Sequence, residues 1–207
     1  MTPSTQEEFC KDVRDLLEFY FKVSEKRKSG VQKLLSEVLS YAHPDISIDC
    51  SIKMRTAGNN SLNYKGYFVS NEVFNANKGE GFKKRNGEKV QITDEHIIPK
   101  AVVIEYLKDA YKNNTLSDSM ILYMTKLLSY SCLVTAEEND LLQKQGLQRK
   151  MPDGWHFPED LDFAKEDLPD LEKLDFFARY KKAGIMYVEN PNVDKVKKEY
   201  GGYKNFY

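Results

Sequence analysis

The chain has 207 residues, a formal net charge of −1, 41% hydrophobic residues and 30% charged residues. It is long enough to bury a sizeable core, and its composition excludes a disordered or fibrous chain. The near-zero charge excludes a global attraction to polyanions, no apolar stretch approaches the ~20 residues of a membrane span, and no N-terminal leader is recognisable. We therefore expect a soluble cytoplasmic protein without membrane contact.

Two helices are predicted at the N-terminus. Residues Thr5–Lys28 repeat apolar side chains at the spacing of one helical face, and Gly30–Tyr41 do the same until His43-Pro44, where proline bars continuation. We assign residues 1–44 to an N-terminal helical region.

The hydrophobic period then changes to that of strands. Residues 46–54 alternate strictly between apolar and polar side chains, which predicts a strand with one buried face. Residues 63–70 favour a further strand, and the turn signal Asn86-Gly87 predicts that residues 88–93 lead back as another.

Helical spacing returns after Pro99, over residues 102–111, and again over residues 120–128, where Ser117 or Asp118 is the expected cap. A short β-like run follows and ends at Thr135. The residues Thr135-Ala-Glu-Glu138 fit a capping box, which predicts that a helix begins at Ala136.

The last part of the chain has fewer signals. Met151–Gly154 read as a turn, Leu171–Lys182 as the position of one more helix, and the remainder as irregular. Residues 146–207 are therefore assigned to a C-terminal extension.

Two short motifs carry possible chemistry. "DEHIIP" (Asp94–Pro99) places acids and His96 at the end of a strand, and "VTAEEN" (Val134–Asn139) places Asn139 in the first turn of a helix entered from another strand. Together they resemble the HNH or His-Me finger nuclease superfamily, in which residues of two strands and a helix bind one divalent cation. The resemblance implies an α+β fold, with a ββα-metal core over residues 45–145 and a helical insertion at residues 100–128.

The resemblance implies a role for each matching residue. Glu95 matches a metal-ligating carboxylate, His96 the general base, and Asn139 the helix-borne ligand that completes the protein's share of the shell of Mg²⁺ or Mn²⁺. A neutral imidazole can take a proton from water, and oxygen ligands suit such an ion. Asp94 stays open as the ligand in place of Glu95, because neighbouring strand residues point to opposite faces.

The chain also departs from the pattern of that superfamily. Tyr130 stands nine positions before Asn139, where the family usually has a bracing asparagine, and zinc-binding cysteine pairs are absent. His96 and Asn139 lie 43 positions apart, which requires the helical insertion. The alternative reading is ordinary structure, since acids before a proline-started helix are favoured by the helix dipole.

Local basic clusters are the expected contacts to nucleic acid. Lysine and arginine neutralise phosphates, although a solvated surface is the alternative for each cluster. The candidates are Lys83, Lys84, Arg85, Lys100, Arg149 and Lys150.

The predicted activity is metal-dependent hydrolysis of DNA phosphodiester bonds, with RNA left open as the substrate. The resemblance suggests a bacterial or phage setting in restriction, defence or mobile elements, and a homodimer or a partner subunit bound through the N-terminal helices. The rival hypothesis is a non-catalytic nucleic-acid-binding or assembly subunit that retains the core as a scaffold.

Overall fold

A computed structural model describes residues 6–41, 68–77, 90–128, 130–158, 161–163 and 175–189. These residues combine helices with a four-stranded mixed sheet, so the predicted α+β class is confirmed. The elements in chain order are α1 (Gln6–Lys22), α2 (Glu25–Tyr41), β1 (Phe68–Ser70), α4 (Asn71–Asn77), β2 (Ile92–His96), α5 (Lys100–Lys112), α6 (Asp118–Leu127), β3 (Ser131–Thr135), α7 (Ala136–Lys144), α8 (Ala178–Ala183) and β4 (Tyr187–Glu189).

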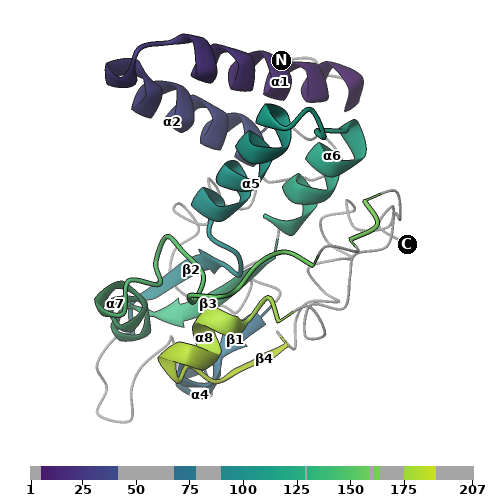
Figure 1. Ribbon diagram of the computed structural model, residues 1–207. Coiled ribbons are helices and arrows are strands. Elements are labelled where there is room, and N and C mark those ends of the chain that lie inside the picture. The colour runs from purple at the N-terminus through teal and green to yellow at the C-terminus, as the bar shows by residue number, and fades with distance from the viewer. Residues whose placement is uncertain are drawn as a thin grey trace.

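The N-terminal helices form a hairpin that lies on the α5–α6 pair, at the opposite end of the molecule from the sheet (Figure 1). The first predicted helix is too long, because α1 ends at Lys22 and α2 already begins at Glu25. Ser24, between them, is a residue that favours helix starts, and Gly30 is accommodated inside α2. The predicted strand at residues 46–54 and the turn Asn86-Gly87 lie outside the described residues.

The strand order is β2-β3-β1-β4. β3 pairs antiparallel with β2 and parallel with β1, and β4 pairs antiparallel with β1. A strand does follow the Asn86-Gly87 position, as β2, but β3 lies between β2 and β1, so these two strands are not neighbours in the sheet. Two further elements were not predicted from the sequence. Helix α4 directly follows β1, and strand β4 forms where an irregular end was expected.

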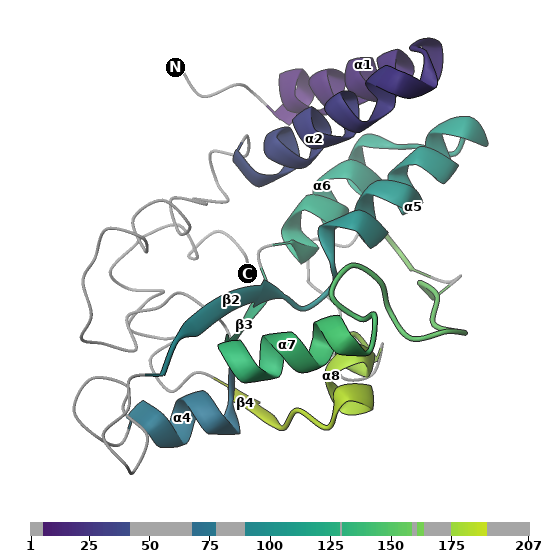
Figure 2. The ribbon, with the colours of Figure 1, turned by 90° about the vertical axis from the view of Figure 1, so that its left-hand side faces the viewer.

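The sheet has two differently covered faces, since side chains along a strand alternate. Cys132 and Val134 of β3 share one buried cluster with Leu142 of α7, so we call this side the α7 face. Leu133 points the other way, into a cluster with Val69 and with Val73 of α4, and we call that side the α4 face. In the view of Figure 2, α7 lies in front of β3 and beside β2.

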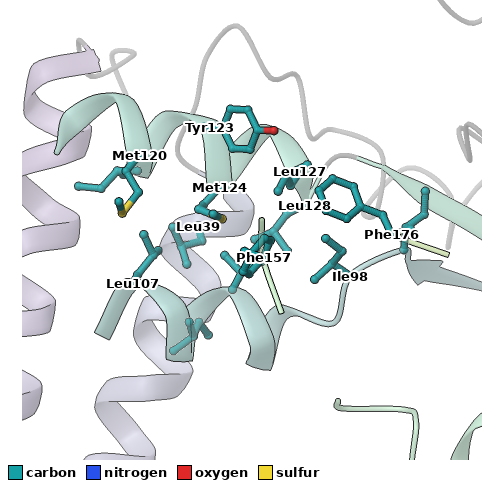
Figure 3. Close-up of a cluster of buried hydrophobic side chains, with 14 of the residues drawn as sticks. Leu39, Ile98, Leu107, Met120, Tyr123, Met124, Leu127, Leu128, Phe157 and Phe176 are labelled. Atoms are coloured by element: carbon teal, nitrogen blue, oxygen red, sulfur yellow. The ribbon is translucent and has the colours of Figure 1, made fainter. Parts of the chain in front are cut away.

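The insertion helices α5 and α6 join the N-terminal hairpin to the sheet through one continuous core. Figure 3 shows Leu107 of α5, Met124 of α6 and Leu39 of α2 in the same cluster as Ile98, which directly follows β2. Phe157 packs into the same cluster, with its ring centroid 4.6 Å from that of Tyr106. The insertion is therefore packed firmly against the end of β2.

Among the described helices, none has both the length and the apolar character that a bilayer crossing requires.

Candidate functional site

His96 is the last residue of β2 and pairs in register with Ser131, the first residue of β3. Its Nδ1 atom lies 2.6 Å from the backbone carbonyl oxygen of Leu128, at the C-terminal end of α6. A carbonyl oxygen can only accept, so Nδ1 carries the proton and Nε2 is the acceptor in the neutral ring. Among the described residues, Nε2 has no hydrogen-bond partner.

The surroundings of His96 keep its ring neutral. Burial lowers the pKa of His96 to about 4, the positive charges of Lys100 and Arg179 lower it as well, and the hydrogen bond to Leu128 opposes them. At neutral pH the ring is therefore a neutral imidazole, with its one proton on Nδ1. Such a group can accept a proton from water next to an anionic substrate.

The two acids before His96 lie on opposite faces of the sheet. Glu95 pairs in register with Cys132 and so lies on the α7 face, where its Oε2 atom is 3.2 Å from Nη2 of Arg179. Asp94 pairs with Leu133 and lies on the α4 face. Asp94 is exposed, yet loss of hydration around its carboxyl raises the pKa of Asp94 to about 6; the nearby charge of Glu95 raises it as well, and a hydrogen bond with Ser131 opposes both.

The predicted capping box at the start of α7 is confirmed. The Thr135 hydroxyl accepts from the Glu138 amide at 3.2 Å, and Glu138 Oε2 accepts from the Thr135 amide at 2.8 Å. Glu138 is also tied to β1, because it accepts a hydrogen bond from the Ser70 hydroxyl at 2.6 Å. Burial raises the pKa of Glu138, while the bonds from Ser70 and Thr135 lower it. These contacts fix the N-terminal turn of α7 on the sheet.

Asn139 follows Glu138 in this turn and is half-buried. Its Oδ1 atom is buried and has no hydrogen-bond partner among the residues that the structure describes. Glu138 and Leu142 are the buried residues of α7, and Asn139 is the neighbour of Glu138 on this helix, which lies on the same side of the sheet as Glu95. A buried acceptor without a donor is costly, and a bound cation is one way to satisfy it.

The donor atoms of Glu95 and Asn139 suit a hard cation. Glu95 Oε1 has no partner among the described residues, whereas Oε2 binds Arg179. Carboxylate and amide oxygens are typical ligands of Mg²⁺, which keeps several waters and takes few protein ligands. Within the described ranges, no group of three His, Cys, Asp or Glu side chains is placed to hold a metal ion.

Tyr130 occupies the position where the resemblance leads one to expect a bracing asparagine. Its carbonyl accepts a hydrogen bond from the amide of Ile97 at 3.0 Å, and its side chain packs against the main core. A backbone bond therefore holds the turn after His96 to the start of β3.

The predicted basic residues lie in different surroundings. Lys100 begins α5 and is half-buried; burial lowers the pKa of Lys100, and Glu37 of α2 opposes this. Arg149 and Lys150 are exposed after α7, with Lys150 Nζ 3.9 Å from Asp153 Oδ1. Lys83, Lys84 and Arg85 lie outside the described residues.

Arg179 of α8 is a residue of this site that the sequence analysis did not single out. Its side chain is fully buried, and it contacts Glu95 and the backbone next to His96. The only local signal is a single arginine after the apolar run Phe176–Ala178. The partner of His96, the carbonyl of Leu128, is a backbone atom, so no pattern of side chains could have predicted it.

Comparisons with known protein families, with curated proteins and with solved structures find no match for this chain.

Proposed function

We propose that this protein is a metal-dependent endonuclease of the HNH type, which hydrolyses phosphodiester bonds of DNA, with RNA as the alternative substrate. The observation that carries the proposal is the hydrogen bond of His96: Nδ1 donates to the Leu128 carbonyl, which leaves Nε2 as the acceptor of a neutral ring. The succession of β2, the α5–α6 insertion, β3 and α7 supports it, since this is the order that a ββα-metal core with a helical insertion requires.

In the proposed reaction, the chain activates water and orients the substrate. Nε2 of His96 takes a proton from a water molecule while the water oxygen attacks phosphorus, and the bond from phosphorus to the leaving oxygen breaks. The leaving oxygen receives a proton from solvent. The Leu128 carbonyl holds the ring during this step and stabilises the imidazolium that forms.

Glu95 and Asn139 would hold the cation, for which Mg²⁺ or Mn²⁺ is proposed. The cation would neutralise charge on the scissile phosphate and on the leaving oxygen. Both acids are kept as the proposed carboxylate ligand: by the register Glu95 lies on the α7 face, the side of the helix that carries Asn139, whereas Asp94 shares the other face with His96. Lys100, Arg149 and Lys150 are proposed as contacts to the phosphates along the strand.

The rival proposal is a non-catalytic subunit that uses the N-terminal hairpin for assembly. One observation favours it: Phe19 of α1 and Leu34 of α2 are each 51% exposed. Under the nuclease proposal, the same surface is available for a homodimer or a partner subunit. The setting in bacterial or phage restriction, defence or mobile elements rests on the resemblance alone.

A substrate panel separates the two proposals. The full chain is incubated with plasmid, single-stranded DNA and RNA, with Mg²⁺, Mn²⁺ or EDTA. The nuclease proposal expects cleavage that requires the metal and is lost in His96→Ala. Binding of nucleic acid without cleavage under any metal would favour the non-catalytic subunit.

A further inference from the structure

The guanidinium of Arg179 donates hydrogen bonds to acceptors in two separate parts of the site. Nη2 donates to Glu95 Oε2 at 3.2 Å and to the carbonyl of His96, and Nε donates to the carbonyl of Ile97 at 3.1 Å. Nη1 donates to the carbonyls of Leu147 and Gln148, at 3.1 Å and 3.4 Å. One side chain therefore binds the end of β2 and the loop after α7.

We propose that Arg179 is a positioning residue of this site: it aims the Glu95 carboxylate and holds the backbone of His96 against the segment that follows the Asn139 helix. This inference rests on the proposed function and extends it, because it makes α8 part of the catalytic apparatus. Arg179 itself is fully buried and contacts no solvent, so it acts through Glu95 and His96.

The chemistry of the guanidinium explains why arginine suits this position. Its planar fork offers several N–H donors in fixed directions, whereas a lysine ammonium is a compact charge that cannot reach acceptors on both sides. Three consecutive residues of the β2 end, Glu95 to Ile97, are bound by one rigid group. Their relative placement is thereby set, including the angle at which Glu95 presents its second oxygen.

Tyr180 supports the same arrangement from the neighbouring position. Its hydroxyl accepts from Arg179 Nη2 at 3.1 Å and donates to the carbonyl of Glu95 at 3.4 Å. Tyr180 is also fully buried, so the hydroxyl has protein partners only. Residues that orient a ligand of a metal commonly change metal affinity and turnover when they are altered, although they do not touch the metal.

The experiment uses the full chain with Arg179→Lys, and Lys182→Gln on the exposed side of α8 as the matched control. Circular dichroism and thermal unfolding establish that each variant is folded. We then measure Mn²⁺ affinity by titration, and kcat and KM for DNA at saturating Mn²⁺. We expect Arg179→Lys to weaken Mn²⁺ binding by about tenfold and to lower kcat by about tenfold or more, with KM for DNA within about twofold. Lys182→Gln should match the wild type in all three.

Two results would overturn the inference. If folded Arg179→Lys binds Mn²⁺ and turns over like the wild type, Arg179 is structural only and the proposed function stands. If the wild type neither cleaves DNA nor binds Mn²⁺, the proposed function fails and this inference fails with it. Should Arg179→Lys not fold, Tyr180→Phe replaces it, since that change removes only the hydroxyl; a drop of about threefold in kcat is expected, and unchanged kcat and Mn²⁺ affinity would contradict the inference.

Discussion

His96 and Leu128 are joined by a hydrogen bond of 2.6 Å from Nδ1 to the backbone carbonyl, although they lie 32 positions apart. Leu128 follows the last residue of α6, so its carbonyl is among those that a helix end leaves without an intrahelical partner. The imidazole satisfies that carbonyl, and the carbonyl selects the tautomer of the imidazole. The helical insertion therefore takes part in defining the chemistry of His96.

Acid should destabilise the protein through His96. Burial lowers the pKa of His96 from 6.5 to about 4 in the folded chain. Above pH 6.5 the ring is neutral in both states and contributes nothing. As the pH falls toward 4, only the unfolded chain is protonated, so stability is lost, by up to about 3 kcal/mol.

The measurement is the free energy of unfolding in EDTA at about pH 7.5 and about pH 4.5, for wild type and His96→Gln. The variant should lose less stability on acidification than the wild type, because its amide does not titrate. His156→Gln serves as the control, since His156 is exposed. An equal acid loss in wild type and His96→Gln would contradict the depressed pKa.

The link between Ser70 and Glu138 should contribute measurably to stability. The Ser70 hydroxyl donates to Glu138 and accepts the amide of Val73 at 3.2 Å, so it joins the starts of α4 and α7. Ser70→Ala should cost about 1–3 kcal/mol in urea unfolding, because it leaves buried polar groups without partners. Gln143→Ala, at an exposed position of α7, should change the free energy by less than about 0.5 kcal/mol. A cost for Ser70→Ala as small as that of the control would count against the link.

The packing of the insertion can be tested with one chemical change at two positions. Leu107 of α5 is completely buried, whereas Leu34 of α2 is 51% exposed. Leu107→Ala should lower the free energy of unfolding by about 2–5 kcal/mol, through lost burial and the cavity left behind. Leu34→Ala should cost less than about 1 kcal/mol. Similar costs at both positions would mean that α5 is not packed as described.

Lys100 should contribute to DNA binding more than a lysine at the other end of the same helix. Lys100 lies close enough to His96 to lower its pKa, while Lys112 in the last turn of α5 is exposed. Lys100→Gln should weaken DNA binding and reduce the slope of log affinity against log salt by about one. Lys112→Gln should leave both quantities unchanged. If the two variants behave alike in fluorescence anisotropy titrations, Lys100 is not at the DNA interface.

The features predicted correctly from sequence depend on local signals. The Ser117 cap of α6 and the Thr135–Glu138 capping box each lie within a few residues, and both are formed in the structure. The helical periods of α5 and α6 belong to the same class of signal, because they repeat within single elements.

The features that were missed depend on contacts far apart in the chain. The parallel pairing of β1 with β3 and the addition of β4 join distant segments, and no local pattern specifies a strand's neighbours. Arg179 and Glu95 are 84 positions apart, so the residues next to Glu95 in the sequence contain no signal that predicts their ion pair. The Asp94 and Glu95 alternatives could be assigned to faces of the sheet only after the register with β3 was known.

The most direct test of the proposed function is the single-turnover rate of DNA cleavage in Mn²⁺, for wild type, His96→Ala and His156→Ala. We expect that the wild type cleaves only with metal, that His96→Ala is slower by at least about 100-fold, and that His156→Ala stays within about twofold of the wild type. Equal rates for wild type and His96→Ala, or no cleavage by the wild type with any divalent metal, would contradict it.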